Sequence, residues 1–163
     1  MELDKNKGYE IPKLITALGV TLITGFIGTF FTAEPLTTWY TNLNKPYWTP
    51  PDWAFGPIWT MIYILIGIAA YLIWKNGLER KDVKIALLVF ALQLILNLLW
   101  SVLFFGFKSI YGGLIEIIIL WITILFNFIL FYRISKFAGI LFLPYLVWVT
   151  IASYLNYSIY ILN

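Results

Sequence analysis

One short segment joins two long apolar runs and organises the chain around it. It reads Trp48-Thr49-Pro50-Pro51-Asp52-Trp53-Ala54-Phe55-Gly56-Pro57-Ile58-Trp59. Proline fixes φ, lacks an N–H donor and restricts the residue before it, so three prolines in twelve residues predict a stiff, irregular turn rather than helix or strand. The three tryptophans are either interface anchors or the rim of a ligand pocket, and their clustering favours the pocket.

The composition is that of a membrane protein. Of 163 residues, 61% are apolar and only 12% are charged. The chain has no cysteine and no histidine, which excludes disulfides, thiolate or imidazole metal sites, a cysteine nucleophile, a Ser-His-Asp triad and the usual haem ligands. We therefore expect no metal and no bound cofactor. The net charge of +3 does not call for a nucleic-acid partner, because the basic residues fall in loops.

Five apolar runs are long enough to cross a bilayer, and they predict an all-α membrane protein with a single domain over residues 1–163. The predicted spans are residues 11–31, 55–74, 83–105, 110–132 and 137–162. Residues 32–54 form a long, aromatic-rich loop, which we expect to be an ordered lid over a ligand pocket, with one short helix over 36–42. The first run is longer than the apolar core of a signal peptide, so no cleaved leader is expected.

The basic residues predict how this bundle lies in the membrane. One side carries nine of them: Lys5, Lys7, Lys13, Lys75, Arg80, Lys81, Lys84, Arg133 and Lys136. The other side carries Lys45 and Lys108. The positive-inside rule then predicts an integral protein of the cell membrane with a cytoplasmic N-terminus and with the lid and C-terminus outside.

Polar and aromatic residues recur at helical spacing within three of the spans. The stripes are Gln93, Asn97, Trp100 and Phe104; Trp148, Ala152 and Leu155, with Ser153 and Asn156 beside them; and Trp59, Tyr63 and Gly67. Polar side chains in lipid face a neighbour or a cavity, so these stripes predict inward faces that line one pocket. The alternative is that the amides only join helices and the tryptophans only anchor the interface.

Two further features of the spans concern Glu116 and three glycines. Glu116 is the only acidic residue within a predicted span, with Thr123 and Asn127 on the same side, and an intramembrane carboxyl is a candidate functional site. The alternative is that Glu116 is wetted near the membrane surface. The glycines of the first span, at positions 19, 25 and 28, predict a smooth face for helix packing rather than a ligand site.

Several motifs, in order, make the chain similar to the translocator protein family, also called tryptophan-rich sensory proteins. The motifs are Trp39-Tyr40 with Leu43, Lys45-Pro46, Trp48-Thr49-Pro50-Pro51, Phe55-Gly56-Pro57-Ile58-Trp59, Gln93 to Asn97 with Trp100-Ser101, and Pro144-Tyr145-Leu146-Val147-Trp148 with Leu155-Asn156. The resemblance implies a five-helix bundle with a pocket that opens beneath the first long loop and binds protoporphyrin IX, haem and isoquinoline-carboxamide drugs.

The resemblance also implies the residues of the ligand site. Carried over by motif, they are Tyr40, Pro50, Trp59, Gln93, Asn97, Trp100, Trp148 and Ala152. We add Trp48 from the lid and Tyr63 from the second span.

The resemblance leaves more than one function open. The preferred interpretation is a receptor for porphyrins and related flat apolar ligands. An enzyme that degrades protoporphyrin IX with light and oxygen is one alternative, with Trp59 and Trp148 as catalytic residues. A transporter of tetrapyrroles or sterol-like molecules is another, and a scaffold that acts through protein partners is a third. The resemblance also allows a homodimer, whereas the lack of a basic residue after Tyr157 argues against a sterol site there.

Overall fold

The described part of the chain, residues 7–163 of a computed structural model, consists of five long helices. They are α1 (Lys7–Thr37), α2 (Asp52–Trp74), α3 (Lys81–Ser101), α4 (Ile110–Ile134) and α5 (Lys136–Leu162). All five are long and apolar enough to cross a membrane, and none of the residues described here forms a strand. This confirms the predicted all-α membrane fold. Lys5, counted above among the basic residues, lies outside the described residues.

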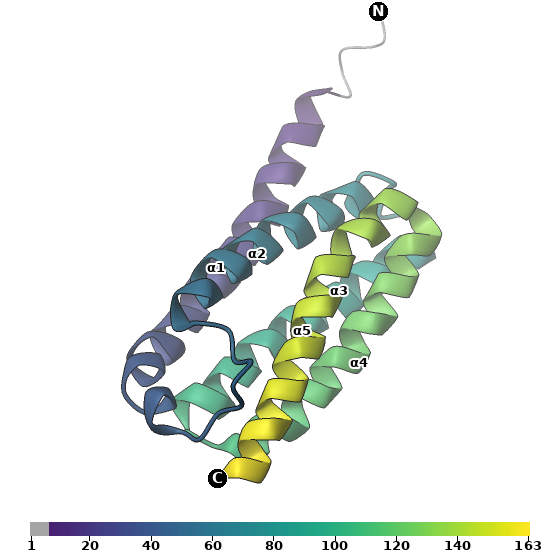
Figure 1. Ribbon diagram of the computed structural model, residues 1–163. Coiled ribbons are helices and arrows are strands. Elements are labelled where there is room, and N and C mark those ends of the chain that lie inside the picture. The colour runs from purple at the N-terminus through teal and green to yellow at the C-terminus, as the bar shows by residue number, and fades with distance from the viewer. Residues whose placement is uncertain (1–6) are drawn as a thin grey trace, which may run out of the picture.

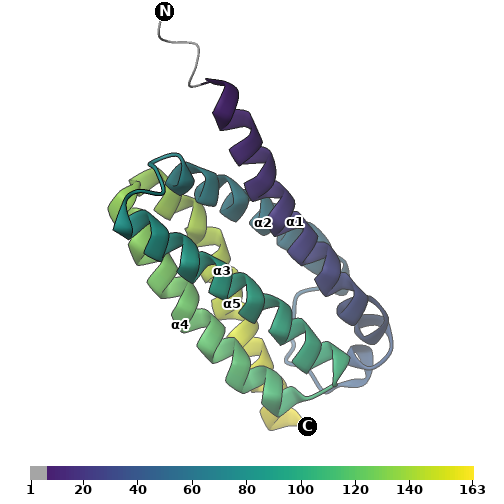
Figure 2. The ribbon, with the colours of Figure 1, turned by 180° about the vertical axis from the view of Figure 1, so that it is seen from behind.

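The helices form a ring in the order α1, α2, α5, α4, α3 (Figures 1 and 2). Short turns join α2 to α3, α3 to α4 and α4 to α5, so helices consecutive in sequence run in opposite directions. The ring closes where α1 meets the end of α3, at the lid end of the bundle. The first turn of α1 and the C-terminus of α5 lie at opposite ends of the molecule, as an odd number of spans requires (Figure 1).

The first helix is longer than predicted at both ends. It continues six residues beyond the expected end at residue 31, to Thr37, and includes Pro35. Proline lacks an N–H but has a φ value compatible with a helix, and threonine hydroxyls hydrogen-bond to backbone carbonyls on both sides of it. The helix expected over 36–42 is therefore wrong: its first residues belong to α1, and only Tyr40–Asn42 form a separate 3₁₀ turn.

The proline-rich segment is only partly an irregular turn. Its first four residues are, but α2 begins at Asp52, three residues before the predicted start, and includes Pro57. The first amides of a helix have no partners within it, so Pro51 can precede it at little cost, and the Asp52 carboxylate suits the positive end of the helix dipole. Trp53, expected in the irregular turn, instead lies on α2, whereas Trp59 lies on α2 as the predicted span over 55–74 indicated.

The third helix ends in a π-helical turn, Val102–Gly106, which the sequence pattern did not predict. The amide of Phe107 donates to the carbonyl of Val102 at 2.8 Å, a spacing of five residues. Within this wider turn Phe104 and Phe105 are both buried, and their rings pack at 4.9 Å. The turn thus directs two adjacent aromatic side chains into the bundle beside α1. By contrast, α4 and α5 begin and end within two residues of the predicted bounds.

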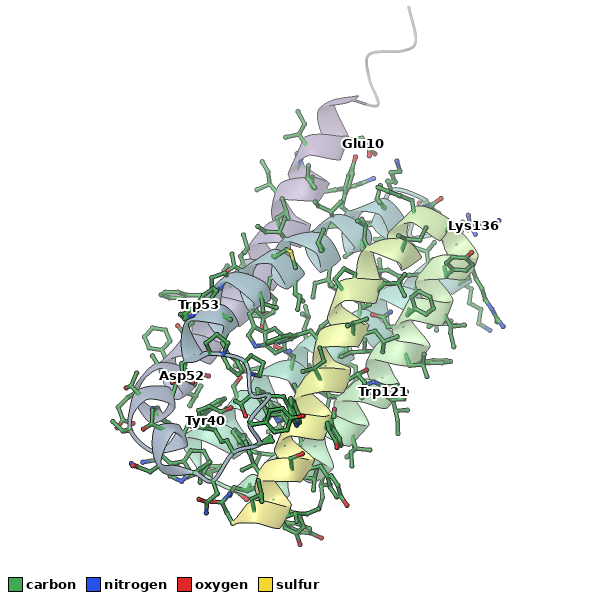
Figure 3. All side chains as sticks on the ribbon, in the orientation of Figure 1. Glu10, Tyr40, Asp52, Trp53, Trp121 and Lys136 are labelled. Carbon is green, nitrogen blue, oxygen red and sulfur yellow. The ribbon has the colours of Figure 1, made fainter. Side chains whose placement is uncertain are left out.

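The lid, defined as residues 38–51, is fastened mainly to α5. The side chain of Asn163 accepts a hydrogen bond from the Asn44 amide at 3.0 Å and donates one to the Asn44 carbonyl at 2.9 Å. Further along, the ring of Trp48 stacks on Tyr154 of α5, with centroids 5.2 Å apart. These contacts hold the lid over the C-terminal end of the bundle, where Tyr40 lies in Figure 3.

Candidate functional site

A cavity of about 440 Å³ lies between α1, α2 and the lid-side end of α3. Among its lining residues are four that the sequence predicted: Trp59, Tyr63, Asn97 and Trp100. Twice as many come from α1, namely Leu22, Gly25, Phe26, Gly28, Thr29, Thr32, Ala33 and Leu36. We call this space the main cavity.

Aromatic rings form the α2 and α3 walls of the main cavity. Trp59 stacks on Tyr63 with centroids 5.7 Å apart and packs edge-on against Tyr145 of α5 at 6.1 Å. Trp100 is buried and stacks on Phe104 at 5.3 Å. Each of the two tryptophans thus has one face fixed by a neighbouring ring, which limits its rotation. Such fixed indoles offer rigid, flat surfaces to a ligand.

A chain of buried hydrogen bonds crosses the bundle behind these rings. The hydroxyl of Tyr63 donates to Asn97, the Asn97 amide donates to the hydroxyl of Tyr145 at 3.2 Å, and that hydroxyl donates to Gln93 at 2.9 Å. Only Tyr63 and Asn97 reach the main cavity, while Gln93 lies behind them with its side-chain nitrogen unpartnered among the described residues. In an apolar interior this chain fixes the relative positions of α2, α3 and α5.

A second, much smaller cavity of about 20 Å³ lies beneath the lid. It is lined by Tyr40 and Ala152, both predicted site residues, and shares Phe55, Trp100 and Phe105 with the main cavity. These three aromatic side chains therefore form the partition between the two spaces. Burial, and to a lesser extent the nearby charge of Asp52, raises the pKa of the Tyr40 hydroxyl above its ordinary value, and this hydroxyl has no hydrogen-bond partner among the described residues.

The remaining predicted residues lie outside both cavities. Trp148 is buried behind Phe55, with ring centroids 5.7 Å apart, and its indole nitrogen has no partner among the described residues. Trp48 lies on the surface of α5, and Pro50 is a half-buried lid residue. The sequence stripes thus predicted which faces point inward but not which inward residues meet in one cavity.

The sequence analysis did not predict that residues of α1 line the cavity. The packing expected of the α1 glycines is confirmed at Gly25, which lies against Tyr63, but Gly25 and Gly28 also line the main cavity. Gly19 has no neighbour within 4 Å of its Cβ position. Phe105, in the π-helical turn, was also missed. The available signal was the small-residue face itself, since a face without side chains can leave space for a ligand as well as for a helix.

Glu116 of α4 lies in the bundle interior and not at a wetted surface. Its side chain is 4% exposed, and neither carboxyl oxygen has a hydrogen-bond partner within the described part of the chain. Asn127 on the same helix is also buried, and its amide donates to the carbonyl of Ala86. Thr123 is only half-buried, and its hydroxyl bonds to the carbonyl of Ile119. Glu116 is therefore a buried acid with no counter-charge from residues 7–163.

Five apolar helices, three of which line an aromatic cavity, define an integral membrane protein of the helical-bundle class. The chain belongs to the TspO/MBR family, whose model matches residues 17–162.

Relatives in bacteria, archaea and animals resemble nearly the whole chain. It is 44% identical to the tryptophan-rich protein TspO of Chlorobaculum tepidum over 154 residues, which cover 94% of this chain and 98% of that protein. It is 46% identical to the tryptophan-rich protein TspO of Archaeoglobus fulgidus, covering 94% and 99%. The human translocator protein is 32% identical, covering 91% and 90%.

Proposed function

We propose that this protein is a membrane receptor for protoporphyrin IX and related flat, apolar ligands, which bind in the main cavity. The observation that carries the proposal is a pair of indoles, Trp59 and Trp100, each stacked on a neighbouring ring in the cavity wall. The same walls present two polar side chains, Tyr63 and Asn97. Flat apolar molecules are bound by such rings, and a few polar groups fix their orientation.

The size of the cavity supports this assignment. A volume of about 440 Å³ lies within the range of roughly 300–1,000 Å³ that is usual for small-molecule sites. A macrocycle at the upper end of this size would also have to displace the aromatic partition, whose members Phe55 and Phe105 touch the small cavity beneath the lid. Two or three ring contacts, each worth about 0.5–1.5 kcal/mol beyond area burial, are consistent with micromolar affinity.

A fluorescence titration tests the proposal. Protoporphyrin IX is added to the protein in lipid nanodiscs while tryptophan emission is recorded, and quenching is expected to saturate at micromolar ligand. Trp59→Phe should weaken binding, whereas Trp53→Phe is the matched control, because Trp53 is 76% exposed and lies outside the cavity. Absence of quenching at micromolar ligand in the wild-type protein would remove the proposal.

A light-driven degradation activity is the second candidate, because Trp59 borders the space in which a porphyrin would lie. An indole in contact with a photoexcited macrocycle is positioned for electron transfer. The activity predicts new product absorbance under light and oxygen that needs the protein and that disappears in Trp59→Phe while binding persists. Equal rates in the wild type and Trp59→Phe would exclude a role for Trp59, and equal rates with and without protein would assign the chemistry to free porphyrin.

We further propose that the protein lies in the cell membrane with its N-terminus in the cytoplasm. The support is the excess of Lys and Arg at the end of the bundle that carries the loop between α2 and α3. The lid would then face outward. Protease digestion of sealed, oriented vesicles tests this, because cleavage in the lid should occur only from the outer side.

A further inference from the structure

The main cavity has a buried floor and an exposed rim, and the two are made of different residues. Tyr63, Asn97 and Trp100 form the floor, each less than a tenth exposed. The exposed lining residues, which form the rim, come from α1 and α2 alone: Leu22, Phe26, Thr29, Ala33, Gly56 and Thr60. The opening of the cavity therefore lies between α1 and α2.

The contacts of α1 differ along its length, and this difference accounts for the opening between α1 and α2. Near the middle of the bundle α1 packs closely on α2, with Gly25 against Tyr63 and Thr21 against Gly67. Towards the lid, α1 instead approaches the end of α3, where a Cβ atom on Gly28 would lie 3.6 Å from the hydroxyl of Ser101. Between the lid-side halves of α1 and α2 lies the main cavity, and we call its exposed opening the gap.

The gap lies at membrane depth. Thr60 is eight residues from the start of α2, and at 1.5 Å per residue that is about 12 Å below the lid end. A bilayer core is about 30 Å thick, so most of the rim faces hydrocarbon and not water. The rim also suits lipid chemically: the hydroxyls of Thr29 and Thr60 donate to the carbonyls of Phe26 and Gly56 on their own helices, and no rim side chain is charged.

The opposite approach, through the lid, is closed. Asn163 holds Asn44 by two hydrogen bonds, and the Asn44 side chain donates to the carbonyl of Leu162 at 3.2 Å. Lys45 lies over the ring of Tyr40 at 4.4 Å and donates to the Tyr40 carbonyl at 2.7 Å. No residue of the lid lines the main cavity.

We propose that the gap between α1 and α2 is a lateral portal, through which ligands dissolved in the bilayer enter and leave the main cavity while the lid stays latched to α5. The proposal rests on the proposed function, since it names the route to the same site and restricts the ligands to molecules that partition into lipid. This lateral route differs from the one that the family resemblance implies, in which the pocket opens beneath the first long loop.

The first experiment needs no ligand. Because the chain has no cysteine, a nitroxide can be attached to a single Thr60→Cys variant in nanodiscs, with Tyr47→Cys in the lid as the control. Tyr47 is fully exposed. At position 60 the label should collide with oxygen, which concentrates in lipid, more often than with a water-soluble nickel chelate. At position 47 the order should reverse. Equal access of the nickel chelate to both labels would overturn the portal.

The second experiment measures protoporphyrin IX binding rates in nanodiscs by stopped-flow quenching. A Cβ atom at Gly56 would meet no atom within 4 Å, so a side chain can start there without a clash, and Gly56→Phe is chosen to narrow the portal. Gly19→Phe, at a position that is equally open at Cβ, is the matched control on α1. In Gly56→Phe the association and dissociation rates should fall together and leave Kd within about twofold. Asn163→Ala, which releases the lid, should leave both rates within about twofold of wild type.

Two kinetic results would contradict the portal: faster association in Asn163→Ala with no change in Gly56→Phe, or weaker affinity in Gly56→Phe with an unchanged association rate. If the wild-type protein shows no quenching at all, the proposed function fails, and the spin-label comparison still decides whether the cavity opens to lipid.

Discussion

Gly25 of α1 lies directly against the ring of Tyr63 of α2, with no room between them for a methyl group. The same tyrosine stacks on Trp59 and donates a hydrogen bond to Asn97, so one side chain joins helix packing to the wall of the cavity. The packing of α1 and the shape of the candidate site are therefore coupled through Tyr63.

Gly25→Ala should both destabilise the protein and weaken ligand binding. The added methyl group must displace the Tyr63 ring, and overpacking of this kind typically costs about 1–3 kcal/mol. Gly19→Ala is the matched control, because its Cβ position is open and alanine favours a helix over glycine, so the thermal midpoint should stay unchanged or rise. Thermal unfolding in detergent checks stability, and protoporphyrin IX quenching checks binding. Equal behaviour of the two variants would contradict the close contact.

Tyr63→Phe tests the hydrogen bond on the cavity wall. The change keeps the ring but leaves the Asn97 carbonyl oxygen without its donor in the bundle interior, at a cost of about 1 kcal/mol. We expect a lower thermal midpoint than in Tyr157→Phe, a matched change at a half-exposed position on α5. An unchanged midpoint would indicate that water replaces the lost donor.

The two tryptophans assigned to the degradation reaction should differ in binding. Trp59 borders the main cavity, so Trp59→Phe should raise the Kd for protoporphyrin IX about two- to tenfold, the range expected for loss of one ring contact. Trp148 lies behind Phe55, and Trp148→Phe should change Kd by less than about twofold. A larger effect of Trp148→Phe would mean that Phe55 moves aside when the ligand binds.

Iron-free protoporphyrin IX should bind at least as tightly as haem. The described chain has no histidine or cysteine, and Met61 is half exposed and does not line the main cavity. Tyr63 is the tyrosine on the cavity wall, and its hydroxyl is engaged with Asn97. Parallel titrations of the two ligands check this, and much tighter binding of haem would reveal an iron ligand.

Glu116→Gln should leave the thermal midpoint unchanged or raise it. Burying an ionised carboxyl without a counter-charge is expensive, and neither oxygen of Glu116 has a partner among the described residues, so a neutral amide of the same shape removes no interaction. Asn127→Asp is the matched reverse change on α4 and should lower the midpoint, because it replaces the donor to Ala86. A marked loss of stability in Glu116→Gln would show that the carboxyl has a polar partner.

The sequence by itself determined the five spans and their inward faces, because apolar length and helical spacing are local properties of the chain. The stripe through Gln93, Asn97 and Trp100 is buried as its period indicated. Helix ends were less predictable, because a helix can continue or start wherever its terminal hydrogen bonds are completed by nearby groups. Thus α1 continues past Pro35, and α2 begins at Asp52.

Only the tertiary structure decided where those inward faces meet. The close contact of Gly25 with Tyr63 sets how α1 crosses α2, and the π-helical turn places Phe105 between the two cavities. Together they open the main cavity between α1 and α2 and leave Trp148 outside it. Packing between helices depends on pairs of side chains distant in sequence, and a helical period reports which face of a helix is buried but not what lies opposite.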